Sequence, residues 1–251
     1  MLNFKTFSDL RPKKTRAFVF VKILRLWNWP PNYFGEEPTM ILVDEKGHRI
    51  DAKSSRHAYK EEMISTLREG KWYILSNFKV VVANPLERFS THVFQIEFLK
   101  KTTMEPVTPK SRYHFIECVD FHTIKHAAPI QKKFVVDAMG VIESVSPIGK
   151  IPWVARDWES DFASRYLVFT LKDSMHKYIK CVAVGSSCEE FERKWYKKIS
   201  EPNFKMEPVM IILRFWKISE FEGKPCLISV YGCSKVHIDP NFRGIDKNNY
   251  L

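Results

Sequence analysis

The chain has 251 residues, 45% of them hydrophobic, which is enough apolar material for one large domain or for two of about 125 residues. Its 40 basic and 29 acidic residues give a net charge of +11, which favours a polyanionic partner but does not separate nucleic acid from an acidic membrane surface. Because it has no apolar run near the ~18 residues of a membrane-spanning helix, no C-x-x-C pair and no glycine-rich phosphate loop, we expect no membrane partner, zinc ribbon or nucleotide cofactor.

The first half of the chain is rich in strand patterns. It opens with a long run of β-branched and aromatic residues that ends at a proline pair, which is typical of a curved strand. Turn residues between Asp44 and Gly47 separate two apolar runs and predict a hairpin, while Tyr59, Met63 and Leu67 recur every four residues and predict a helix. The elements expected here are strand 17–29, hairpin 39–52, helix 55–68 and strands 72–83 and 90–100.

The second half shows the same order of elements. Its opening strand contains Gly140, as at a barrel bend. In its helix, Ser186 is placed to cap the first turn, and Phe191, Trp195 and Ile199 share one face. The elements expected here are strand 134–142, hairpin strands 166–174 and 177–184, helix 186–199 and strands 208–218 and 226–238.

The two halves are related by a nearly constant offset. Asp44 matches Asp173 at a distance of 129 residues, and Phe89 matches Phe221 at 132. Each half therefore has five strands with a helix between the third and the fourth, which is the order of the OB-fold. We expect an all-β protein of two tandem OB-fold five-stranded Greek-key barrels joined by a partly helical connector. The expected ranges are 1–101 for the first barrel, 102–132 for the connector and 133–251 for the second barrel.

Six motifs, taken in order, resemble the large subunit of replication protein A, particularly its plant relatives. They are residues 21–27, 40–50 and 75–80 in the first half and residues 136–142, 169–173 and 219–229 in the second. The resemblance covers about residues 14–101 and 132–246, which is most of the chain. It implies a non-enzymatic protein that binds single-stranded DNA in replication, recombination or repair, a nuclear location, and other replication protein A-like subunits as candidate partners.

The resemblance also implies individual site residues. Phe89 and Phe221 match base-stacking aromatics of the family, and basic residues at nearby positions are expected to hold phosphates. Lys22, Lys79 and Lys217 fall where the family has basic residues that contact the nucleic-acid backbone, and Arg25 and Arg88 are further candidate cations. Two further stacking positions of the family are occupied by Ser55 and Val184, and neither side chain can stack on a base.

Each of these residues also has a structural interpretation. Either phenylalanine can fold back onto its own barrel, a lysine that alternates with apolar neighbours on a strand can simply be solvated, and Trp27 can be a core residue. If both missing aromatics lose a stack of about 1–3 kcal/mol each, affinity falls by roughly one to four decades. Basic contacts would still give salt-sensitive binding without sequence preference.

Other chemistry finds little support in the sequence. His114, Cys118, His122 and His126 recur every four residues but span too many helical turns to converge on one metal ion, and no catalytic set stands out. We therefore expect no enzyme activity, no metal and no cofactor. Two rival functions stay open: a protein-interaction module that has lost its nucleic-acid ligand, favoured by Ser55 and Val184, and an RNA-binding or telomere-end protein.

Overall fold

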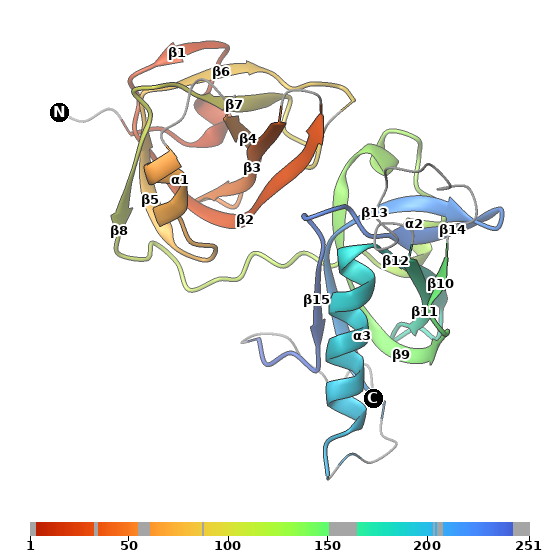
Figure 1. The fold of residues 1–251 in the computed structure, drawn as a ribbon. Helices are drawn as coiled ribbons and strands as arrows, with labels where there is room; N and C mark the ends of the chain where they lie inside the picture. Colours follow the sequence, from red (N-terminus) through yellow and green to blue (C-terminus); the bar gives the residue numbers. More distant parts are fainter. Residues whose placement is uncertain are drawn as a thin grey trace. The chain divides into compact units, whose positions relative to one another are not determined.

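The computed structural model describes residues 4–32, 35–54, 61–86, 88–150, 165–202, 204 and 208–242. The chain divides into two compact units, Met1–Phe115 and Ile116–Leu251, and both are built mainly from β-strands (Figure 1). Each unit is an OB-fold barrel, which confirms the predicted fold class. No helix within the described ranges is long and apolar enough to cross a membrane.

The first unit forms one eight-stranded sheet in the order β1-β6-β7-β4-β3-β2-β5-β8. β5 and β6 are separated only by Asn77, so together they form the predicted fourth strand, and they pair with β2 on one side of this bend and β7 on the other. β4 and β7 pair in parallel. The elements are η1 Phe7–Asp9, β1 Lys13–Thr15, β2 Val19–Asn32, β3 Gly35–Asp44, β4 Arg49–Ser54, α1 Glu61–Thr66, β5 Trp72–Ser76, β6 Phe78–Val82, β7 Phe94–Phe98 and β8 Thr103–Val107.

The second unit repeats this topology in a seven-stranded sheet. Its path runs β10-β11-β12-β14-β13-β15, and β9 pairs with both β11 and β13, which closes the barrel. The parallel pair β12 with β14 corresponds to β4 with β7. The elements are α2 Phe121–Lys125, η2 Gln131–Lys133, β9 Val135–Val145, β10 Gly149–Lys150, β11 Arg165–Lys172, β12 Tyr178–Val184, α3 Ser186–Ile199, β13 Met210–Phe221, β14 Lys224–Ile228 and β15 Lys235–Ile238.

The structure refines several predicted boundaries. The last predicted strand, 226–238, is two strands, because β14 pairs with the hairpin end of β13 and β15 with its beginning. The predicted connector contains β8, which pairs with β5 of the first barrel, followed later by α2 and η2. Of the predicted helix 55–68, residues 55–60 lie outside the described residues. Gly140 lies at a close approach, since a Cβ there would be 2.7 Å from the carbonyl oxygen of Lys172.

The turn between β3 and β4 of the first barrel has the same geometry as the turn between β11 and β12 of the second. Asp44 accepts hydrogen bonds from the backbone N–H groups two and four residues later, both at 2.9 Å, and Asp173 does the same at 3.0 and 2.8 Å. The residue before the second donor is left-handed in both turns: Gly47 has φ +91° and His176 has φ +56°. The sequence match of Asp44 with Asp173 is thus a match of backbone geometry.

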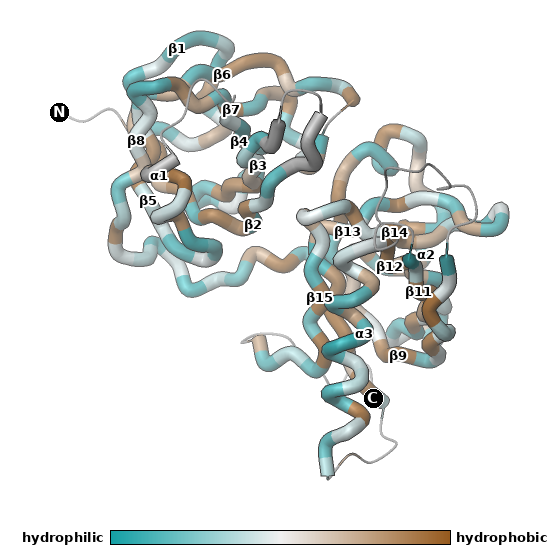
Figure 2. The backbone as a smooth tube through the Cα atoms, viewed as in Figure 1, coloured by the Kyte–Doolittle hydropathy of each residue, from teal (hydrophilic) through white to brown (hydrophobic). Residues whose placement is uncertain are grey.

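Alternation along the strands sorts side chains between a core and an outward face. Hydrophobic residues interleave with hydrophilic ones along the strands of each unit (Figure 2). In the first barrel the core takes Met40 and Leu42 of β3, and Thr39, Ile41 and Val43 are left for the outward face. In the second barrel the core is centred on aromatic packing, with Phe169 stacked on Phe191 at 4.3 Å.

Candidate nucleic-acid interface

OB-folds bind oligonucleotides on the outward face of the second and third strands, between two loops. In the first barrel this face is made by β2, β3 and β4 and is bordered by the loop between β6 and β7, which holds Phe89. In the second barrel it is made by β9, β11 and β12 and is bordered by the β13–β14 hairpin, which holds Phe221. Both predicted stacking residues therefore border the expected face.

Phe89 is packed against its own barrel. Its ring meets Trp27 edge to face at 4.9 Å, and each side chain is only 5% exposed. Trp27 lies on the outward face under Phe89, and its buried Nε1 has no hydrogen-bond partner among the described residues, which is an unfavourable feature of this conformation. Stacking of Phe89 on a base would require the ring to leave Trp27.

A buried carboxylate holds the Phe89 loop down. Asp51 of β4 accepts hydrogen bonds from the backbone N–H of Phe89 at 3.0 Å and of Ser90 at 2.9 Å. Burial raises the pKa of the Asp51 carboxyl above its ordinary value, while these hydrogen bonds act in the opposite direction. A cavity of about 20 Å³ remains between Phe89, Asp51, Lys53 and Gln95, which is room for about one water molecule and none for a base.

The predicted cations of the first barrel all have protein partners. Lys22 is 8% exposed and its Nζ donates to the Tyr113 carbonyl at 2.6 Å, and Arg25 forms an ion pair with Glu69. The other two also contact the protein. Lys79 pairs with Glu97 across β6 and β7 at 2.9 Å, and Arg88 donates to the carbonyls of Thr91 and His92 within its own loop.

Phe221 has a different environment in the second barrel. It is half-buried at the end of a two-residue turn, where Glu222 and Gly223 have φ values of +52° and +71°, as in a type I′ hairpin. Its ring lies 6.2 Å from that of Tyr166, tilted by 53°, and the Lys180 Nζ lies 5.6 Å from its centroid. We call Tyr166, Lys180 and Phe221 the aromatic cluster.

The aromatic cluster draws on three strands, and sequence reasoning found only one of its members. Tyr166 lies directly opposite Val184 in the β11–β12 register, so an aromatic ring adjoins the position where the family aromatic is missing. The alternation of core and outward residues along β11 could have identified Tyr166, because Leu167 belongs to the core and its neighbour Tyr166 is therefore on the outward face. A Cβ at Gly149 would lie 2.8 Å from the Tyr166 ring, so glycine there makes room for it. Ser55, the other missing aromatic, lies outside the described residues.

Lys217 shares the outward face with Phe221. The two residues lie four positions apart on β13, about 13 Å along the strand, and Lys217 is opposite Ile228 of β14. Lys180 forms an ion pair with Glu222 at 2.7 Å, and both side chains of this pair are more than a third exposed. An exposed ion pair of this kind is worth ~0–1 kcal/mol, so it is readily exchanged for another anion.

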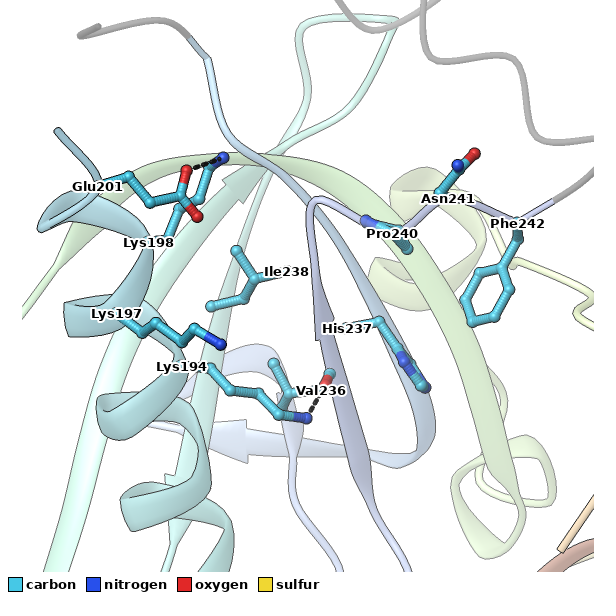
Figure 3. Close-up of a pocket in the computed structure, with 10 residues that line it drawn as sticks. All are labelled: Lys194, Lys197, Lys198, Glu201, Val236, His237, Ile238, Pro240, Asn241 and Phe242. Atoms are coloured by element: carbon cyan, nitrogen blue, oxygen red, sulfur yellow. Dashed lines mark hydrogen bonds and ion pairs between the residues drawn. The ribbon is translucent and has the colours of Figure 1, made fainter. Parts of the chain in front are cut away.

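A larger hollow lies at the other end of β13, between α3 and β15 (Figure 3). It has a volume of about 440 Å³ and is lined by Lys194, Lys197, Lys198, Glu201, Val236, His237, Ile238, Pro240, Asn241 and Phe242. Lys194 donates to Glu190 and to the Val236 carbonyl, both at 2.6 Å, and Lys198 contacts Glu201 and Asp239. Burial, aided by nearby Lys194, lowers the pKa of His237 to about 4. These lysines are engaged in holding α3 to β15 and its flanks.

In the part of the chain that the structure describes, no three His, Cys, Asp or Glu side chains are grouped to hold a metal ion.

Comparison with known proteins supports the fold. The family model described as DUF223, a domain of unknown function, matches residues 8–127. No curated protein sequence matches the chain. A solved replication protein A heterotrimer bound to single-stranded DNA contains a chain that is 17% identical, with a TM-score of 0.59, over 95% of this chain and 52% of that one. This chain thus spans about half the length of that relative.

Two other solved structures show weaker likeness. A murine DNA-binding protein bound to double-stranded DNA is 11% identical with a TM-score of 0.45, over 92% of this chain and 99% of that one. The OB domain of a Methanosarcina mazei protein is 18% identical with a TM-score of 0.34, over 43% of this chain and 87% of that one. The class that the fold defines is a tandem OB-fold protein.

Proposed function

We propose that this chain is a non-enzymatic single-stranded DNA-binding protein related to the large subunit of replication protein A, and that its second barrel carries the accessible binding surface. Phe221 and Tyr166 offer ring faces for bases, and Lys180 and Lys217 offer positive charge for phosphates. The observation that carries the proposal is the aromatic cluster on the outward face of an OB-fold. Solved relatives of this fold include a replication protein A bound to single-stranded DNA.

The cluster has the chemistry that single strands require. Every base has a π-face, so stacking on an aromatic ring is tolerant of sequence and is worth about 1–3 kcal/mol per base. A lysine beside the ring adds an attraction to the phosphate, and each phosphate neutralised makes affinity fall with salt. We therefore expect affinity without sequence preference and with strong salt dependence.

The test is a fluorescence-anisotropy titration of the full chain with labelled oligo(dT) at fixed salt. Phe221→Ala and Tyr166→Ala should each weaken binding about 5-fold or more, consistent with the loss of one stack. Tyr166→Phe should bind like the wild type, since it keeps the ring. Tyr196→Ala is the matched control, because Tyr196 is an exposed tyrosine of α3 outside the cluster. Unchanged affinity of both alanine variants, with folding intact, would contradict the proposal.

The resemblance extends the proposal to replication, recombination or repair in the nucleus, with replication protein A-like subunits as partners. Competition between oligo(dT) and oligo(rU) for the same protein decides whether DNA or RNA is the ligand. Co-purification of the tagged full chain from nuclear extract with other single-strand-binding subunits tests the partner assignment.

One observation favours a second candidate function, a protein-interaction module. Among the described residues, the expected face of the first barrel is covered by Phe89, Trp27 and residues that follow β8. An electrophoretic-shift series from low to physiological salt separates the two functions. A shift that weakens as salt rises supports single-strand binding, and no shift at any salt supports the interaction module.

A further inference from the structure

Residues 110–115, here called the strap, cross the outward face of the first barrel. Three of its backbone carbonyls accept hydrogen bonds from side chains of β5, β2 and β4. Trp72 Nε1 donates to Ser111 at 3.2 Å, Lys22 Nζ to Tyr113 at 2.6 Å and Arg49 Nη2 to Phe115 at 2.8 Å. The acceptors are alternate residues, so every second carbonyl from Ser111 to Phe115 is directed at the barrel.

The three donors belong to a single cross-strand row. Trp72 of β5 is opposite Lys22 of β2, Lys22 is opposite Val43 of β3, and Val43 is opposite Arg49 of β4. Neighbouring strands lie about 4.8 Å apart, so the row spans about 14 Å, and five extended residues span about 13 Å. The strap therefore runs across the strands and follows this row. Val43 points away from the core and is nevertheless fully buried, which shows how closely the row is covered.

Side chains of the strap add to these contacts. The Phe115 ring meets Trp72 edge to face at 6.2 Å and lies 5.5 Å from the Lys22 Nζ, and Lys110 Nζ lies 3.8 Å from the centroid of Phe20. Phe115 has a φ of +52°, a left-handed conformation that disfavours residues other than glycine. Tyr113 is 77% exposed, and its ring meets that of Phe115 within the strap edge to face at 6.4 Å.

We propose that the strap is a displaceable occupant of a second single-strand site in the first barrel, and that a nucleic-acid strand competes with it for the row of donors. The proposal rests on the proposed function. Lys22 and Arg49 are cations hydrogen-bonded to neutral carbonyls. A phosphate oxygen carries a negative charge, so it would add an attraction between opposite charges to the hydrogen bond. The strap binds the donors more weakly than a phosphate would, but it belongs to the same chain, which gives it an effective concentration of roughly millimolar.

A tethered competitor lowers the apparent affinity of the site without changing its contacts. The apparent dissociation constant is the intrinsic one divided by the fraction of molecules in which the strap is open. Loosening the strap must therefore tighten binding. This effect is opposite in sign to the loss of a contact residue, which makes it recognisable.

The experiment uses the full chain and labelled oligo(dT) at fixed salt. The variant Tyr113→Gly/His114→Ser/Phe115→Ser keeps Lys110 and Arg112 and so keeps the charge. It removes the Phe115 ring and adds a flexible glycine at position 113, without placing glycine at the left-handed position 115. We expect it to bind about 5-fold or more tightly than the wild type. Adding Lys22→Met should remove this gain. The matched control is Ala128→Gly/Pro129→Ser/Ile130→Gly, a change of equal length at exposed residues in the second unit, which should show no gain.

Failure of this proposal differs from failure of the proposed function. If the strap variant binds no more tightly than the wild type while Phe221→Ala still weakens binding, the strap is not a competitor and single-strand binding stands. If no variant binds at low salt, both proposals fail. A second measurement covers the case of a misfolded variant: in the wild type, saturating oligo(dT) should accelerate tryptic cleavage after Arg112. An unchanged or slower cleavage would overturn the competition.

Discussion

The two barrels have the same topology and the same hairpin turn, yet their outward faces differ. In the first barrel Phe89 lies on Trp27 and the strap lies on Lys22 and Arg49, so the face is closed by the chain itself. In the second barrel Phe221 is half-buried among Tyr166 and Lys180 at the border of the face. An OB-fold thus determines where a binding face lies but does not determine whether that face is open.

One position accounts for much of the difference at the phenylalanines. The repeat offset of 129 residues that relates Asp44 to Asp173 also relates Asp51 to Lys180. In the first barrel this position holds a carboxylate that accepts two N–H groups of the Phe89 loop and holds it down. In the second barrel it holds a cation that cannot accept, and its ammonium faces the Phe221 ring instead.

The strap row differs in the same way. The register aligns the row of the first barrel with Met210, Val141, Lys172 and Tyr178 in the second. Of these four, only Lys172 is basic, and it lies 3.8 Å from Glu143. These four positions of the second barrel therefore lack the set of side-chain donors that bind alternate carbonyls of the strap in the first barrel.

The largest expected effect separates the two phenylalanines by stability. Phe89→Ala should destabilise the first barrel by about 3 kcal/mol, because a buried aromatic ring and its contact with Trp27 are lost. Phe221→Ala should cost the second barrel less than about 1 kcal/mol, since its ring is only half-buried. Urea unfolding followed by unit-specific hydrogen exchange measures both. Equal losses in the two barrels would show that the two phenylalanines have equivalent environments.

A smaller expected effect is a pH dependence of stability, and it arises from a residue of β15 whose counterpart in β8 is different. The register places Glu105 of β8 where His237 stands in β15, and Glu105 is exposed. Burial first, then Lys194 and Arg214, lowers the pKa of His237 to about 4, with Glu190 acting in the opposite direction. As pH falls below about 6.5 the unfolded chain takes up this proton before the native state does, so stability is lost between about pH 6.5 and 4.

The loss should appear in the second unit only. Between pH 7 and pH 5 we expect it to lose about 1–2 kcal/mol of unfolding free energy through this group. His237→Gln should flatten this dependence, while His48→Gln in the first unit, at a half-exposed histidine, serves as the control. Urea titrations at the two pH values measure it. A slope that is the same with and without His237 would contradict the assignment.

The smallest effect concerns the shared turn. His176 takes the left-handed conformation that Gly47 takes in the first barrel, and a side chain there costs roughly 1 kcal/mol. His176→Gly should therefore raise the stability of the second barrel by about 0.5–1 kcal/mol, and Gly47→Ala should lower that of the first by about 1 kcal/mol. Thermal unfolding detects both changes. A loss of stability in His176→Gly, or a gain in Gly47→Ala, would show that the turns are not equivalent.

The fold was predictable because its signals are local. Alternation along a strand, the turn from Asp44 to Gly47 and the spacing of Phe191, Trp195 and Ile199 depend on residues within about one element of each other. The repeat then assigns the same order to both halves. The prediction of one continuous last strand, 226–238, was wrong, because this apolar run forms two strands, β14 and β15, that pair with different parts of β13.

Only the location of the candidate site on the barrels could be predicted from the sequence. Alternation and the repeat bring Phe89, Phe221 and the lysines of the strands to the borders and outward faces of the barrels. Tyr166 and Lys180 also carried this signal, as outward residues of paired strands. The partner that each side chain meets was not accessible from the sequence pattern.

The reason is the distance along the chain. Asp51 holds the Phe89 N–H across 38 residues, Arg49 reaches the Phe115 carbonyl across 66, and Lys22 reaches that of Tyr113 across 91. Short-range periodicity carries no information about such contacts, because they form only after the barrel has brought its strands and the strap together. Two OB-fold barrels, and the faces on which a ligand is expected, follow from local patterns in the sequence. The cover over the first face and the aromatic cluster at the second arise from contacts between residues that are distant in the chain.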